Sequence, residues 1–172
     1  RHSTRKSEIM ILGMLYDSEL PDLIQAGIGF YVFDFDRLQK AIDVSRDLGI
    51  AAKIHVELET GFHRTGFDWE DRAQLASLLQ EAKDHVILEG LCTHYAGAES
   101  VSNYVRVKNQ IAVYYDFKNF LSENNLFFNR YHTACSAATL IFPETIMDMV
   151  RIGIAGYGFW PRKESFFAKL KD

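Results

Sequence analysis

Short apolar runs alternate along this sequence with longer segments whose apolar residues recur every three or four positions. The runs have the length and composition of strands. They predict strands at 9–14, 29–34, 52–58, 86–95, 130–135 and 148–154. The intervening segments predict helices at 17–27, 38–48, 68–83 and 107–121. This alternation is typical of an α/β protein with a parallel sheet.

The number of repeats restricts the architecture further. About six strand–helix units are present, against the eight units and about 250 residues of a complete (β/α)8 barrel. No linker rich in Pro, Gly or Ser interrupts the chain, so residues 1–172 are expected to form part of one domain. We expect an incomplete (β/α)8 TIM barrel. A doubly wound sheet, which needs no missing strands, is the alternative.

Composition excludes several classes of function. The chain is 48% hydrophobic and 24% charged with a net charge of −4, so it is globular and lacks the basic field of a nucleic-acid-binding protein. No apolar run approaches a membrane span, and the N-terminal RHSTRKSE has no signal-like apolar core. Cys92 and Cys135 have neither zinc-site nor disulfide-scaffold spacing, so we expect no metal and a cytoplasmic protein.

Ligands of parallel α/β folds bind at the carboxyl ends of the strands, so polar residues there are candidates. Strand alternation places His55, Glu57 and Glu59 on one face. A buried carboxylate needs a partner, and Arg64 is the nearest cation in sequence, with a planar group suited to a bidentate pair. A solvated salt bridge at a loop is the alternative interpretation.

Three further strand ends carry candidates. His94 ends a predicted strand and is either a packed structural histidine or a functional one. Ser136 begins a predicted helix, where it either caps the helix or helps to bind a phosphate. Arg151 lies in an apolar strand and must find a partner there or lose several kcal/mol in desolvation. The glycines at 153, 156 and 158 do not have dinucleotide-loop spacing.

Four segments together resemble the alanine racemase family of fold-type III enzymes, which use pyridoxal 5′-phosphate. The family motifs D-T-G-M-x-R-x-G, S-H-F, N-S-A and V-R-x-G-I-x-x-Y-G correspond in order to four segments here. These are ETGFHRTG (59–66), THY (93–95), CSAATL (135–140) and VRIGIAGYG (150–158). The resemblance implies strands three to eight of the family's N-terminal barrel, without its first two strands and its C-terminal β-domain.

The resemblance also implies an activity. The family interconverts L- and D-alanine, a peptidoglycan precursor, by two-base proton transfer at Cα in a homodimer whose subunits share the active site. Arg64 then corresponds to the arginine that binds the substrate carboxylate. Ser136 and the backbone of Gly153 and Ile154 correspond to the phosphate site, and Arg151 to the arginine facing the pyridine nitrogen.

The resemblance assigns two histidines and identifies several departures. His94 corresponds to the histidine that bridges this arginine to the partner subunit's catalytic tyrosine, and His132 to a supporting residue. Glu57 stands where the family commonly has a carbamylated lysine, and it supplies the same negative charge without modification. Cys135 replaces the asparagine of N-S-A, and Glu59 replaces the D-T-G aspartate.

The proton-transferring groups are the largest departure. The family's cofactor-binding lysine lies in K-A-x-A-Y-G, which does not occur in this sequence, and Lys53 lies at the wrong end of its strand. We therefore expect the 172 residues alone to have no catalytic activity. Two other interpretations stay open: another fold-type III enzyme, such as a decarboxylase or broad-specificity racemase, and a non-catalytic cofactor-binding barrel.

Overall fold

A computed structural model describes residues 7–161 of the chain. It has one sheet of five strands in the order β1-β2-β3-β4-β5, and every neighbouring pair is parallel. The strands are β1 (Met10–Ile11), β2 (Gly29–Val32), β3 (Ala52–Leu58), β4 (Val86–Thr93) and β5 (Arg130–His132). Each connection steps to the next strand in one direction, whereas a doubly wound sheet reverses its order. The fold is an incomplete barrel, as predicted.

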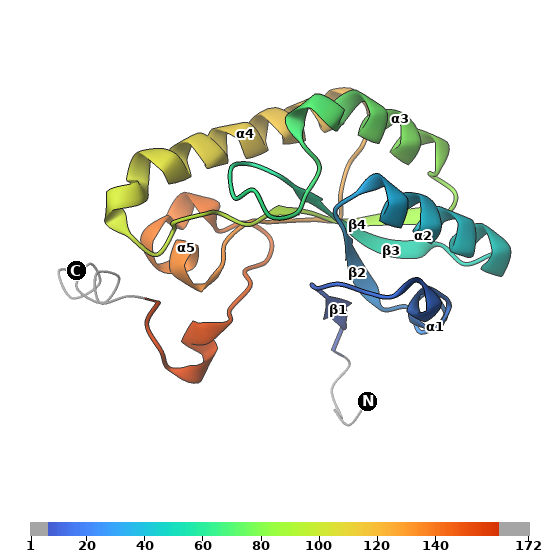
Figure 1. Cartoon of the computed structure of the whole chain (residues 1–172), viewed down its shortest axis with the longest axis horizontal. Coiled ribbons are helices and arrows are strands. Elements are labelled where there is room, and N and C mark those ends of the chain that lie inside the picture. Colours follow the sequence, from blue (N-terminus) through green and yellow to red (C-terminus); the bar gives the residue numbers. More distant parts are fainter. Residues whose placement is uncertain (1–6, 162–172) are drawn as a thin grey trace.

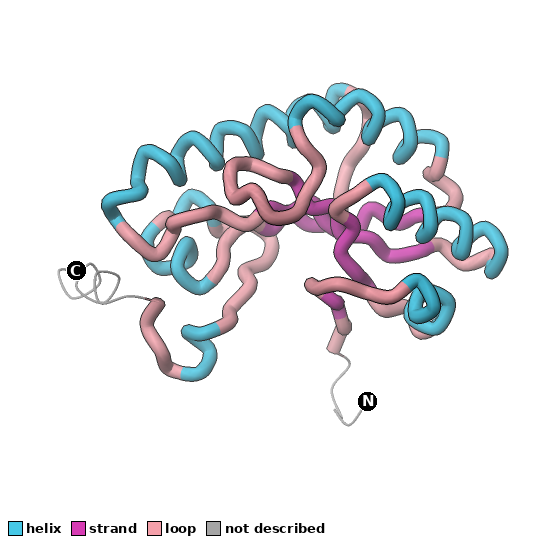
Figure 2. Tube along the Cα trace, in the orientation of Figure 1, coloured by secondary structure: helices cyan, strands magenta, loops and turns pink. Residues whose placement is uncertain are grey.

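Helices cover one side of the curved sheet, and the segment after the last helix runs on the other side (Figure 1). The helices are α1 (Leu20–Gln25), α2 (Phe35–Leu48), α3 (Arg72–Glu81), α4 (Tyr104–Glu123) and α5 (Ser136–Ile141). Single 3₁₀ turns lie at Asp17–Glu19, Trp69–Asp71, Val101–Asn103, Pro143–Thr145 and Ile154–Tyr157. Helix and strand therefore alternate along the tube in Figure 2, as the sequence predicts.

The core lies between the sheet and these helices. Alternate strand residues point outward into it and are buried, including Phe30, Val32, Ile54, Val56 and Leu91. The helices contribute a matching stripe of buried residues: Leu38, Ile42, Leu75, Leu79, Tyr114 and Phe117. Burying a large apolar side chain contributes about 1.5–3 kcal/mol, so this layer fixes the order of the units.

The opposite, inner face of the sheet is buried but polar. It carries Tyr31, His55, Glu57, Cys92 and His132, all at most 4% exposed. Complete barrels usually fill these positions with bulky apolar residues. A polar inner face must satisfy its groups by specific hydrogen bonds, which makes it a candidate for function.

The structure corrects the prediction of a sixth strand at 148–154. This segment runs beside β5 but forms only an isolated bridge between Cys135 and Arg151. Ile152 and Ile154 are about half exposed, and a 3₁₀ turn begins at Ile154. No described strand pairs with the other side of this segment, so a continuous ladder does not form.

Two sequence observations concern other parts of the chain. Residues 1–6 of RHSTRKSE lie outside the described residues. Among the helices that the structure describes, none has both the length and the apolar composition needed to cross a membrane.

Candidate active site

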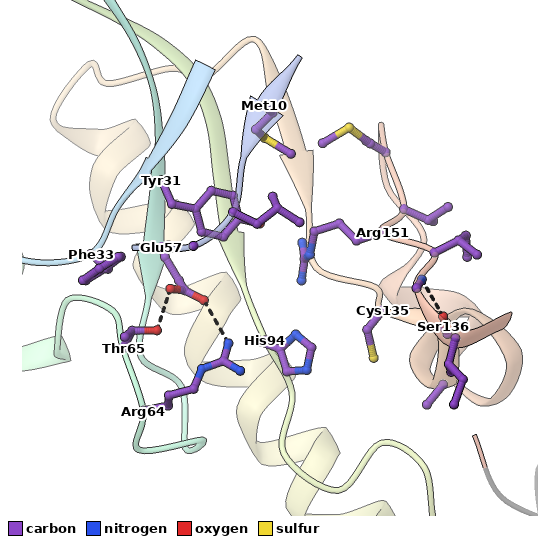
Figure 3. A pocket seen from close by; sticks show the side chains of 18 of the residues that line it. Met10, Tyr31, Phe33, Glu57, Arg64, Thr65, His94, Cys135, Ser136 and Arg151 are labelled. Carbon is purple, nitrogen blue, oxygen red and sulfur yellow. Dashed lines mark hydrogen bonds and ion pairs between the residues drawn. The ribbon is translucent and has the colours of Figure 1, made fainter. Parts of the chain in front are cut away.

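A cavity of about 940 Å³ lies on the inner side of the sheet, at the carboxyl ends of the strands. Its lining includes Arg64, His94, Ser136 and Arg151, which belong to the four segments identified in the sequence. Figure 3 shows Arg151 in this wall, with Glu57 and Arg64 to one side and Ser136 to the other. The topology thus brings together residues from the ends of β3, β4 and β5 and from the segment after α5.

Glu57, at the end of β3, is the buried anion of the cavity. Its side chain is 5% exposed and lies 3.7 Å from the Arg64 guanidinium, whose own side chain is 52% exposed. The Thr65 hydroxyl donates a 2.8 Å hydrogen bond to the same carboxylate. Burial raises the pKa of Glu57, while Thr65 and Arg64 act in the opposite direction. The structure therefore contains the pairing of Glu57 with Arg64 that the sequence suggested.

The loop after β3 holds Arg64 over this carboxylate. Phe67 returns to the strand end, donating to the Glu57 carbonyl and accepting from the Glu59 N–H, both at 2.9 Å. Gly66 has φ +124°, and a Cβ there would lie 2.5 Å from the Glu59 nitrogen. Only glycine tolerates this close backbone return.

Glu59 does not share the environment of Glu57, although alternation placed the two on one face. Its carboxylate accepts hydrogen bonds from the backbone N–H groups of Gly61 and His63, the latter at 2.8 Å. Glu59 therefore stabilises the loop 59–67, and it is not among the residues lining the cavity.

Arg151 is held by four acceptors. One terminal nitrogen, Nη1, donates to the Nδ1 and the carbonyl of His132, each at 2.7 Å. The other, Nη2, donates to the carbonyls of Thr93 at 2.6 Å and Thr133 at 3.1 Å. A guanidinium has four terminal N–H groups and one at Nε. These described contacts use the four terminal groups, which leaves the Nε–H for a ligand.

The histidine in contact with Arg151 is His132, which is fully buried behind the cavity wall. His94 lines the cavity itself and packs edge-on against Phe62, with ring centroids 5.3 Å apart. Burial, followed by the charges of Arg151 and Arg64, lowers the pKa of His94 to about 4. His94 is therefore neutral at pH 7, and its ring has both a donor and an acceptor.

Ser136 begins α5 at the far end of the cavity. Its hydroxyl oxygen accepts from the N–H of Gly153 at 2.9 Å and from that of Ala155 at 3.4 Å. The hydroxyl proton remains available to a ligand. Because the first N–H groups of a helix lack intrahelical acceptors, this corner presents several donors to an anion.

The sequence reasoning missed Tyr31 and Thr65. Tyr31 lines the cavity from β2 and stacks against His55, with ring centroids 6.1 Å apart. A polar aromatic residue alternating with buried Phe30 and Val32 was the available signal. Thr65 had no signal, since only the folded loop places its hydroxyl on Glu57.

A family model described as the N-terminal domain of alanine racemase matches residues 1–161. The chain belongs to the alanine racemase family. An alanine racemase from Desulforamulus reducens is 32% identical over 179 aligned residues, covering 99% of this chain and 46% of that protein. The chain therefore spans less than half the length of such relatives.

Solved alanine racemases have the same fold. The structure from Clostridium difficile 630 superposes with a TM-score of 0.84 at 29% identity, covering 94% of this chain and 42% of that one. The Bacillus anthracis alanine racemase, described with bound L-Ala-P, gives a TM-score of 0.81 at 29% identity, covering 93% and 41%. The shared part is the incomplete barrel of the N-terminal domain.

Proposed function

We propose that the residues lining this cavity belong to an amino-acid racemase that uses pyridoxal 5′-phosphate. They would form the wall that binds the cofactor and the carboxylate of the substrate. The substrate would be L- and D-alanine or a related small amino acid. The carrying observation is the cavity itself, which has two separate cations, Arg64 and Arg151, and an anion-binding corner at Ser136. A small zwitterion and a phosphorylated pyridine present complementary groups.

The donor set fits pyridoxal 5′-phosphate. The Ser136 hydroxyl and the backbone around Gly153 and Ile154 would hold the phosphate, because amide and hydroxyl donors suit a dianion. When bound, this cofactor withdraws electrons from the substrate and makes its Cα proton removable.

Arg151 would set the electronic character of the ring. A guanidinium remains charged at any pH that the fold survives, so it donates from Nε and does not accept. A cation beside the pyridine nitrogen disfavours its protonation. Its four hydrogen bonds to the ends of β4 and β5 prevent it from turning away. This arrangement favours simple proton return over side reactions.

Arg64 would bind the substrate carboxylate, because its planar group matches a carboxylate in a bidentate pair. Glu57 orients it from behind, at 3.7 Å. A fixed glutamate supplies the negative charge that family members commonly obtain from a carbamylated lysine. Neutral His94 would orient the tyrosine of a second subunit. We propose that this tyrosine and the cofactor-binding lysine lie outside these 172 residues, so that the chain alone is inactive.

Binding of pyridoxine 5′-phosphate tests the site without the lysine, because this compound has no aldehyde to react. Calorimetry should show binding that Ser136→Ala weakens about 5- to 30-fold, the equivalent of about 1–2 kcal/mol for a lost hydrogen bond to a charged group. Ser77→Ala, on the outer side of α3, is the control. Equal affinities for the two variants would contradict the assignment of the phosphate corner.

Activity can be tested in a complete relative. Residues 1–161 would replace the matching segment of the Desulforamulus reducens enzyme, with the rest of that enzyme retained. We expect the folded hybrid to racemise alanine and its Arg151→Glu variant to lose most of that rate. A folded hybrid that binds the cofactor but leaves alanine unchanged would overturn the proposal.

A further inference from the structure

Two buried histidines meet on the inner face, and the function proposed above assigns no role to His55 or to the contact between the two rings. His55 lies on β3 and His132 on β5, with β4 between them. Adjacent strands lie about 4.8 Å apart, so side chains on β3 and β5 must reach across a whole strand to touch. They do so here, with His55 Nδ1 and His132 Nε2 2.9 Å apart.

The absent side chain of Gly90 makes this contact possible. A bulge in β4 moves the register so that Gly90, rather than Glu89, lies opposite His55. A Cβ at position 90 would lie 2.1 Å from His55 Nδ1 and 2.8 Å from His132 Nε2. The two rings therefore occupy the space that any other residue at this position would fill.

The direction of the hydrogen bonds follows from Arg151. Its guanidinium can only donate, so His132 Nδ1, 2.7 Å from Nη1, must be the acceptor. The remaining nitrogen of His132 then carries the proton and donates to His55 Nδ1. His55 in turn carries its proton on Nε2. Both rings are neutral, and neither gains a second proton without breaking a bond in the chain.

We propose that His132 and His55 are positioning residues for Arg151, joined to it in a one-way hydrogen-bond chain that passes over Gly90. The role of Arg151 toward a ligand rests on the function proposed above, whereas the chain itself is a property of the ligand-free protein. His132 fixes the plane of the guanidinium. His55 fixes the ring of His132, and it therefore acts on Arg151 through His132.

The surroundings keep both rings neutral. Burial is the largest of the effects that together lower the pKa of His55 to about 4 and that of His132 to about 2. The charge of Arg151 contributes to both shifts. The other charged and titratable groups facing the pair are Glu8, Tyr31, Lys53, Glu57, Glu89, Cys92 and Arg130. Glu89 and Glu8 raise the pKa of His55, but burial outweighs them.

Long-range ¹⁵N–¹H spectra of the 172-residue chain test the hydrogen-bond directions without any substitution in the pair. We expect both histidines to show a protonated Nε2 and an unprotonated Nδ1 at pH 7, and to keep this state to pH 5. His85→Asn, away from the cavity, supplies an assignment control. A proton on Nδ1 of either ring, or titration of either near pH 6.5, would overturn the proposal.

A matched pair of variants tests the positioning role. His55→Asn keeps an acceptor oxygen near the place of Nδ1, whereas His55→Leu removes it at similar volume. Restricted rotation should give Arg151 separate terminal N–H resonances in the wild type and in His55→Asn, and averaged resonances in His55→Leu. Identical Arg151 spectra in all three proteins would show that His55 does not position Arg151.

These outcomes are distinct from a failure of the proposed function. Pyridoxine 5′-phosphate binding tests the ligand site, and the spectra of ligand-free protein test the chain. If His55→Leu does not fold, His132→Leu provides the second measurement. Leucine has a similar volume and presents no acceptor to Arg151. Arg151 should again give averaged resonances, and unchanged resonances would refute the role of His132.

Discussion

Gly90→Ala is the substitution for which the structure gives the clearest magnitude. The new Cβ would lie 2.1 Å from His55 Nδ1, well inside any allowed contact, so the imidazole must move by about 1 Å or more. Such a movement breaks its 2.9 Å hydrogen bond to His132. Overpacking costs about 1–3 kcal/mol, and leaving the His132 N–H without an acceptor costs about 1–3 kcal/mol more.

One effect offsets part of this cost. Replacing glycine with alanine reduces the entropy of the unfolded chain, which returns about 0.4–1 kcal/mol. We therefore expect Gly90→Ala to lower the free energy of unfolding by about 1–5 kcal/mol. Urea unfolding followed by circular dichroism measures this change. Gly13→Ala is the control, since a Cβ there meets nothing within 4 Å.

A double-mutant comparison separates the histidine pair from general crowding. With His55→Ala the principal clash disappears, so adding Gly90→Ala should cost much less than it does in the wild type. A wild-type-like stability for Gly90→Ala would refute the account of why glycine occupies this position. Equal costs in both backgrounds would refute the part played by His55.

Three further predictions concern the cavity wall. Several cavity and inner-face histidines have pKa values well below 6.5: His55, His94 and His132. These histidines stay neutral in the folded protein but take up protons in the unfolded chain, so the free energy of unfolding should fall as pH drops from about 6.5 toward 4. The expected loss at pH 5 is about 2 kcal/mol for each fully buried histidine. A urea midpoint that does not change between pH 7 and pH 5 would contradict this. Glu57→Gln in the hybrid racemase should raise the Michaelis constant by the equivalent of about 1–3 kcal/mol, because Arg64 loses a charged anchor; unchanged steady-state kinetics would remove that role. Gly66→Ala should destabilise the loop return at Glu59 by more than about 1 kcal/mol, and hydrogen exchange that is as slow as in the wild type at residues 59–67 would count against it.

The order of the units and much of the site were predictable from the sequence. The strand predicted at 52–58 is β3, and the helix predicted to end before Gly49 does so, with φ +64° at that glycine. These elements form because their own apolar periodicity and turn residues favour them. The strand-end residues then had to meet at one rim, since all strands of a parallel sheet end on the same side.

The prediction of a sixth strand was wrong for a non-local reason. Residues 148–154 have the composition of a strand, but a strand needs a ladder, and the described part of the chain provides one neighbour and a single bridge. The prediction that Glu59 shares the face of Glu57 was wrong for a local reason. Its carboxylate accepts hydrogen bonds from N–H groups of its own loop, which period-two alternation does not anticipate.

The sequence by itself therefore determined the parallel α/β architecture, the family and the identity of the groups at the strand ends. Local spacing specifies which face a residue takes and where a strand stops. The tertiary structure alone decided that His132 contacts Arg151 and that His55 reaches His132 across the intervening strand β4. That contact depends on a bulge and on a missing side chain at Gly90. Register between strands is set by packing across the whole sheet, so no spacing within one segment of the sequence encodes it.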